Sequence, residues 1–219
     1  MKKLIFATIA LLVSFASNAQ RTMFGGQNNY VAPVVVAPPA LATAGLVLNL
    51  DAGNTASYIG SGNSWNDLSG SNNGTLTNGP LFNTSNKGNI LFDGVDDSVS
   101  ITNVSSLRPT TELTIEMVVK AVTTTAGWNH LFGINPYTSY SPLIFLETGG
   151  QLIRALHFVN GVEYRCNTNE TISTSVFKHV VFTFKTGDAI RSYFNGVAST
   201  TQVIPNGALS YNTSNAFLI

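Results

Sequence analysis

Short runs of alternating apolar and polar residues, separated by Gly, Asn, Ser and Pro about every ten positions, dominate the chain from Gly45 onward. Successive side chains of an extended chain point to opposite faces, so this alternation predicts strands with one buried and one solvated face. Helical periodicity is not sustained anywhere in the sequence. The pattern therefore predicts an all-β domain, either a sandwich or a barrel.

The clearest predicted strands carry this alternation or a short apolar run. They span residues 45–51, 89–93, 97–101, 113–121, 130–134, 142–147, 151–159, 179–185 and 189–195. Many half-solvated strands pack most naturally as two stacked antiparallel sheets. The side chains predicted to face the core in two of these strands are Leu113, Ile115, Met117, Val119 and Ala121, and Val180, Phe182 and Phe184.

The N-terminus has the pattern of a secretory signal peptide, which we assign to residues 1–19. Two lysines precede an apolar run at 4–15, and small residues suit cleavage after Ala19. Gln20 follows that position, so a bacterial lipid anchor has no thiol there. The apolar run is shorter than the roughly 20 residues that span a bilayer, so we expect no transmembrane helix in the mature chain. A secreted or cell-surface location follows.

A Pro/Gly/Asn-rich linker is predicted at residues 20–44, where neither helical nor strand periodicity occurs. It is interpreted either as a spacer that holds a binding domain away from a surface or as a disordered tail. The domain itself is predicted to span 45–219.

Charged residues make up only 10% of the chain, compared with about a quarter in a typical soluble domain, and the formal net charge is zero. Because no run of Lys or Arg occurs, the counterion release that dominates nucleic-acid binding has no source, and we exclude nucleic acid as a partner. A neutral polar surface suits polar ligands such as sugars.

Five fragments in a fixed order carry a family resemblance: GLVLNLDAGN, WNDLSGSNNGTLTNGP, LFDGVDDSVSI, LTIEMVVKA and FKHVVFTFKTGDAIRSYFNGV. Together they resemble the laminin-G-like, concanavalin A-like jelly-roll domains. The resemblance implies an antiparallel jelly-roll sandwich of two sheets. Ser98 and Phe177 stand where the family usually has an aromatic residue and a tryptophan. The family pattern continues with further strands beyond Ile219, so we expect the last strands to be missing.

The stretch LFDGVDDSVSI places Asp93, Asp96 and Asp97 close together in the sequence. Carboxylate oxygens are ligands that Ca²⁺ prefers, and the resemblance implies calcium binding because relatives of this fold often bind it. The alternative is a turn in which the aspartates accept hydrogen bonds from the local backbone. An extended segment sends Asp96 and Asp97 to opposite faces, so convergence requires a tight turn, which Gly94 can allow.

Sugar binding requires an aromatic surface for the apolar face of a pyranose, together with polar partners for its hydroxyls. Trp65, Tyr137 and Tyr140 are the predicted ligand-binding residues. Trp65 can equally be a core residue, whereas the two tyrosines lie in a loop containing Pro136 and Pro142 that is predicted to be exposed.

A glycoside hydrolase is the enzymatic alternative, because glucanases of this fold carry a Glu-x-Asp-x-Glu motif on one strand. Glu112 and Glu116 occur at matching positions, but Thr114 between them cannot hold a charge that separates their pKa values. A solvated strand face explains the same residues.

Other catalytic and metal chemistries lack motifs in this sequence. His130, His157 and His179 occur without a hydrolase nucleophile motif, and His/Cys spacing suited to zinc is absent. Cys166, the single cysteine, is predicted to be a small buried residue.

The sequence therefore predicts a secreted, non-catalytic module that recognises glycans or protein surfaces, as in adhesion. A glycan-active hydrolase and a structural domain of a cell-surface or virion assembly are the alternatives.

Overall fold

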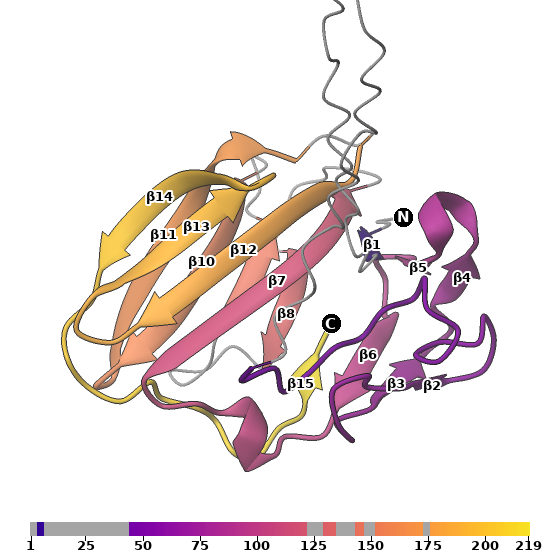
Figure 1. Cartoon of the computed structure of the whole chain (residues 1–219), viewed down its shortest axis with the longest axis horizontal. Helices are drawn as coiled ribbons and strands as arrows, with labels where there is room; N and C mark the ends of the chain where they lie inside the picture. Colours follow the sequence, from indigo (N-terminus) through magenta and orange to yellow (C-terminus); the bar gives the residue numbers. More distant parts are fainter. Residues whose placement is uncertain (1–3, 7–43, 122–128, 135–142, 147–151, 173–175) are drawn as a thin grey trace, which may run out of the picture.

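Two antiparallel sheets stack face to face in the computed structural model, which describes residues 4–6, 44–121, 129–134, 143–146, 152–172 and 176–219 (Figure 1). This arrangement confirms the predicted all-β jelly-roll sandwich. Sheet A has the order β14 (Val197–Val203), β13 (Ala189–Phe194), β12 (Lys178–Lys185), β7 (Glu112–Ala121), β1 (Leu4–Phe6), β5 (Asn89–Phe92) and β4 (Leu81–Asn83).

Sheet B has the order β11 (Val162–Thr171), β10 (Leu152–Val159), β9 (Leu143–Leu146), β8 (Asn129–Ile134), β15 (Phe217–Leu218), β6 (Ser98–Ile101), β3 (Gly74–Thr77) and β2 (Ser64–Trp65). Two short 3₁₀ turns, η1 (Ser85–Lys87) and η2 (Ser105–Leu107), complete the described elements. Among the described residues, we find no helix with the length and apolar character needed to cross a membrane.

The core lies between the inner faces of the two sheets, and the predicted alternation places it correctly. Val180, Phe182 and Phe184 of β12 are at most 1% exposed, as expected from the sequence. They pack in one cluster with Ile153 and Ala155 of β10 in the opposite sheet. Burial of this apolar surface is the main stabilising contribution to such a sandwich.

Two Asn-Gly turns bring β11 and β14, the edge strands of the two sheets, to one side of the sandwich. Asn160 and Gly161 have φ of 52° and 78°, and Asn195 and Gly196 have φ of 50° and 80°. Positive φ at both central residues is the requirement of the tight hairpin turn that suits strand twist, and Asn-Gly meets it at low cost. As a result, β11 returns along β10 and β14 along β13, and β11 and β14 lie side by side (Figure 1).

The predicted strand at 45–51 is wrong, because this segment forms no strand. Its backbone is bonded to a loop instead: Asn49 N–H donates to Asp67 Oδ1 over 2.8 Å, and Leu68 N–H donates to the Asn49 carbonyl over 2.9 Å. Leu50 is still buried in the core, so the apolar pattern here indicates burial without the backbone hydrogen bonds of a β-strand pair. The other eight predicted strands are present, and no end is shifted by more than one residue.

Residues 4–6, within the predicted signal peptide, form β1 between β5 and β7. Ile5 pairs with Leu91 on one side and with Lys120 on the other. Cleavage after Ala19 would remove this strand from the middle of sheet A. Residues 20–43 of the predicted linker lie outside the described residues.

Candidate functional site

The turn between β5 and β6 holds the three aspartates that the sequence singled out. Gly94 has φ of 73° and turns the chain, as expected. Asp93 Oδ1 accepts a hydrogen bond of 2.8 Å from Val95 N–H, and Asp97 Oδ2 accepts one of 2.8 Å from Asp93 N–H. The predicted local turn contacts are therefore present, and they fix the orientation of two of the three carboxylates.

The turn also brings Asp93, Asp96 and Asp97 together, which simple alternation could not do. One carboxylate oxygen from each lies within 4.8 Å of the others. Burial raises the pKa of Asp97, and the negative charges of Asp93 and Asp96 raise it further. This cluster of hard oxygen donors with mutually repelling charges has the composition that suits Ca²⁺.

We call residues 93–97 the acidic loop. A cavity of about 240 Å³ adjoins it. Asp93 and Asp97 line it together with Asn78, Leu81 and Leu91. Leu81 and Leu91 are cross-strand neighbours on β4 and β5, and Leu81 is 65% exposed. The cavity thus combines a small apolar surface with carboxylate and amide groups, the mixture that a sugar ring requires.

Of the three aromatic residues predicted to bind ligand, the structure describes Trp65, which does not line this cavity. Trp65 is only 2% exposed and packs edge-on to Tyr58, with ring centroids 6.3 Å apart. An indole buried to this degree offers no stacking surface, so the structure places Trp65 in its alternative role in the core. Tyr137 and Tyr140 lie outside the described residues, and their role stays a prediction.

Glu112 and Glu116 lie on the outer face of β7, each in contact with a basic residue of β12. Lys185 Nζ lies 2.6 Å from Glu112 Oε1, and His179 Nε2 lies 2.8 Å from Glu116 Oε1. The hydrogen bond from His179 lowers the pKa of Glu116 below its ordinary value. A glycosidase general acid needs a raised pKa, so this carboxylate is tuned in the opposite direction.

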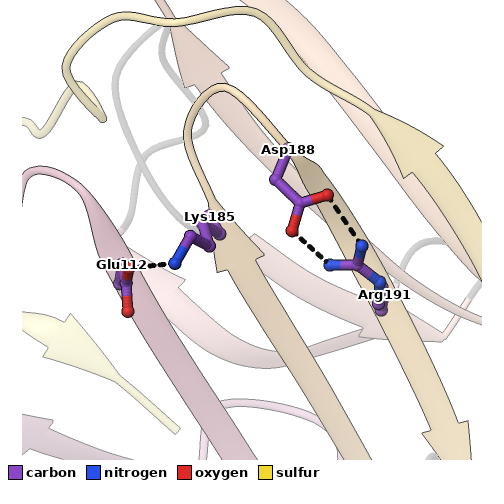
Figure 2. Close-up of polar contacts among 4 residues, drawn as sticks. All are labelled: Glu112, Lys185, Asp188 and Arg191. Carbon is purple, nitrogen blue, oxygen red and sulfur yellow. Dashed lines mark hydrogen bonds and ion pairs between the residues drawn. The ribbon is translucent and has the colours of Figure 1, made fainter.

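The Glu112–Lys185 contact is part of a row of exposed charges at one end of sheet A (Figure 2). Figure 2 shows the Asp188 carboxylate facing the Arg191 guanidinium in a two-point contact, with distances of 2.8 and 2.7 Å. Opposite charges paired in this way on an exposed face explain Glu112 as part of a solvated surface.

His157 and Cys166, also considered for catalysis, occupy buried positions. His157 is fully buried between the rings of Phe184 and Tyr211, and burial lowers its pKa to about 4. Cys166 is 3% exposed, as predicted, and its Sγ lies 3.0 Å from Thr200 Oγ1.

A larger, polar cavity of about 470 Å³ lies where β11 and β14 meet, and sequence reasoning did not identify it. Because the two strands carry mostly polar residues, no apolar alternation signals them. We call this space the edge groove. Its lining residues are Leu152, Arg154, Arg165, Cys166, Asn167, Thr168, Asn169, Thr200, Thr201 and Gln202.

A sequence model of the concanavalin A-like lectin/glucanases superfamily, of the laminin-G type, matches residues 93–219, more than half of the chain. The chain belongs to this superfamily. The match includes the acidic loop, strands β6 to β15 and all residues of the edge groove. A comparison with curated proteins found no match.

Solved structures share the fold at low identity. Domain 4 of AbnA, a GH43 extracellular arabinanase from Geobacillus stearothermophilus, solved with arabinotriose, is 16% identical with a TM-score of 0.54, over 70% of this chain and 76% of that one. The binding domain of Paraclostridial Mosquitocidal Protein 1 is 15% identical with a TM-score of 0.52, over 70% of this chain. The botulinum neurotoxin serotype G binding domain is 12% identical with a TM-score of 0.53, over 69% of this chain.

The matched region spans 44% of the mosquitocidal chain and 42% of the neurotoxin chain. Likeness at this level of identity establishes a common fold and leaves the ligand to be argued from the residues of this chain.

Proposed function

We propose that this protein is a secreted, non-catalytic recognition module that binds glycans and contributes to adhesion. The observation that carries the proposal is the cluster of three aspartates, two of which line a partly apolar cavity. Two of the solved structures with this fold are named as binding domains, and a third, an arabinanase domain, was solved with arabinotriose. These names support a binding role over a catalytic one.

In the proposed site, Asp93, Asp96 and Asp97 hold a calcium ion through one or more carboxylate oxygens each. The ion would offset the repulsion among the three carboxylates and orient the turn. Leu81 and Leu91 supply the apolar surface, and Asn78 supplies an amide for a ligand hydroxyl. Asn78 Nδ2 donates to the Asp96 carbonyl over 2.9 Å, which couples the cavity wall to the loop.

Calcium binding is tested by titration calorimetry and thermal unfolding of the intact chain with Asp96→Asn. This substitution leaves the hydrogen bonds of Asp93 and Asp97 in place, so the turn is retained. We expect a calcium-dependent rise in the unfolding temperature of the wild type and at least about tenfold weaker calcium binding by the variant. Asp188→Asn, which removes a carboxylate from the β12–β13 turn, is the matched control and should bind calcium normally.

Glycan binding is tested separately on a glycan array, with calcium and with a chelator. Leu81→Ser removes the exposed apolar wall of the cavity and should lower retention of a bound glycan. Val176→Ser changes a comparably exposed valine outside the cavity and should not. Equal retention by both variants would exclude this cavity, and the Tyr137 and Tyr140 loop would then be tested by alanine substitution.

Recognition of a protein surface is the second form of the same binding function. It is favoured by the exposed apolar side chains beside the acidic loop, Leu81 and Val95, which are 65% and 71% exposed. An absence of glycan retention, combined with loss of cell-surface attachment in Leu81→Ser, would assign the cavity to a protein partner.

A further inference from the structure

We infer that the outer face of sheet A is a second glycan-binding surface, which takes neutral polysaccharides whose sugar rings form a flat ribbon. The inference rests on the proposed function, because it names a class of glycan, but it concerns a different part of the molecule. This surface lies on β7, β12, β13 and β14, whereas the cavity beside the acidic loop lies at β4 and β5.

Tyr193 is the aromatic residue of this surface. Its neighbours in β13, Ser192 and Phe194, are 1% and 5% exposed, whereas Tyr193 itself is partly exposed. Val181 of β12 likewise lies between two buried residues and is partly exposed. Because successive side chains of a strand point to opposite faces, Tyr193 and Val181 lie on the outer face of sheet A.

Strand register extends Tyr193 into an apolar row. Tyr193 pairs with Val181 on one side and with Ala198 of β14 on the other, and Ala198 is exposed. Val181 in turn pairs with Glu116 of β7. Neighbouring strands lie about 4.8 Å apart, so the row from β7 to β14 is roughly 14 Å long, which is longer than a single sugar ring. We call Val181, Tyr193 and Ala198 the apolar row.

A second row, next to the apolar row, supplies hydroxyl groups. Thr183 of β12 pairs with Thr114 of β7 and with Arg191 of β13. Arg191 pairs with Thr201 of β14. Thr183 is two residues from Val181 along β12, so the two rows share a face. Thr114 and Thr201 are exposed and Thr183 partly so, and each hydroxyl can both donate to and accept from a sugar hydroxyl.

Each carboxylate beside the two rows contacts a basic side chain. The pairs are Glu112 with Lys185, Glu116 with His179, and Asp188 with Arg191. Figure 2 shows the first and the last of these pairs at one end of the face. Paired exposed charges attract a distant ion weakly at physiological salt, so this face favours a neutral ligand over a strongly charged one.

The shape of the surface selects an extended ligand. Among the described helices and strands, none lies across the outer face of β7, β12 and β13 (Figure 1). A β-1,4-linked sugar chain is a flat ribbon with apolar C–H groups on its ring faces and hydroxyls along its edges. Its ring faces match the apolar row, where Tyr193 offers a stacking surface, and its edge hydroxyls match the threonines.

The test is calorimetric titration of the intact chain with matched oligosaccharides in the presence of a calcium chelator. Cellohexaose, xylohexaose and mannohexaose are flat ribbons, and isomaltohexaose is a neutral flexible chain with the same number of sugar units. We expect at least one ribbon to bind at least about tenfold more tightly than isomaltohexaose, with equal affinity at low and high salt. Equal binding of all four chains, or binding that high salt abolishes, would overturn the inference.

Substitutions assign that binding to the outer face. Tyr193→Ala should weaken it at least about tenfold, whereas Tyr193→Phe keeps the ring and should stay within about threefold of the wild type. Thr183→Val keeps the shape of the side chain but removes its hydroxyl, and it should weaken binding by several-fold. Tyr164→Ala, the same change at a partly exposed tyrosine of β11 in sheet B, is the matched control and should bind normally.

Unfolding temperatures of all four variants separate binding from folding. If Tyr193→Ala is unfolded at the assay temperature, Thr183→Val decides, because this substitution suits a strand and leaves no cavity. Full binding by a folded Thr183→Val protein would then contradict the site. Equal losses in Tyr193→Ala and Tyr164→Ala would show a general effect on the fold and contradict it as well.

The two glycan sites can fail separately. Calcium-dependent binding that Tyr193→Ala leaves intact would retain the proposed function and reject the outer face. Chelator-resistant binding that Tyr193→Ala abolishes, with no effect of Leu81→Ser or Asp96→Asn, would retain the outer face and reject the acidic-loop site.

Discussion

His179 Nε2 lies 2.8 Å from Glu116 Oε1 on the outer face of sheet A, joining β12 to β7. This contact lowers the pKa of Glu116, so its contribution to stability is present above the ordinary glutamate pKa and is lost as pH falls through the lowered value. Because the Glu116 side chain is 57% exposed, we expect a contribution below about 1 kcal/mol. Urea unfolding of Glu116→Gln should therefore differ slightly from wild type near neutral pH and converge with it in strong acid. A difference that grows in acid would contradict this assignment.

Burial of neutral His157 predicts a second, larger pH dependence. Its pKa is lowered to about 4 in the folded protein, so the unfolded chain binds the proton more readily between pH 4 and the ordinary value of 6.5. Stability should be complete above this window and decrease as pH falls through it, by up to about 3 kcal/mol.

His157→Leu tests this assignment by urea unfolding across the same pH range. The variant loses the hydrogen bond of 2.8 Å that Phe158 N–H donates to Nδ1, and we expect about 1–3 kcal/mol lower stability at neutral pH. The decline between pH 6.5 and 4 should be largely absent from it. An unchanged decline would assign the pH dependence to another group.

The core position of Trp65 predicts that its substitution affects stability and leaves glycan binding intact. Trp65→Phe retains an aromatic ring beside Tyr58 but leaves a cavity, at a cost of about 1–3 kcal/mol. Thermal unfolding and glycan retention measured on the same preparation check both parts. Lost retention by a folded Trp65→Phe protein would restore the original prediction that this indole binds the ligand.

The sequence predicted strands and the core well where the two faces of a strand differ in hydropathy, as in β7 and β12. Burial alternates along part of β11, where Cys166 and Thr168 are buried. Because Thr168 is polar, the two-residue period of a strand is not visible in the hydropathy of the sequence. Most residues of β14 are polar or exposed, so the same two-residue period is not visible there either. The edge groove lies between these two strands, which is why sequence reasoning did not identify it.

The acidic loop shows the opposite case. The three aspartates were identified from their spacing in the sequence. Their convergence depends on the backbone turn at Gly94, which has φ of 73°, and the alternation of an extended strand does not produce such a turn. Spacing also suggested Glu112 and Glu116 as a pair, but their partners Lys185 and His179 come from a strand more than sixty residues later. Long-range pairing of this kind has no local signal.

The position of β1 between β5 and β7 predicts how a chain cleaved after Ala19 should behave. A chain that begins at Gln20 lacks this strand, which leaves backbone N–H and C=O groups of β5 and β7 without their present partners. We expect residues 20–219 alone to be poorly soluble or to associate, as size-exclusion chromatography with light scattering would show. A sharp, reversible unfolding transition of a monomer would show that the domain does not depend on a strand at this position.

The central claim is that the protein binds glycans without cleaving them, and one incubation tests it most directly. The intact protein is mixed with a panel of polysaccharides in calcium, and retained polysaccharide and newly released reducing ends are measured together. We expect saturable retention of at least one polysaccharide with no increase in reducing ends. Release of reducing ends that Glu116→Gln abolishes would contradict it and establish the hydrolase alternative.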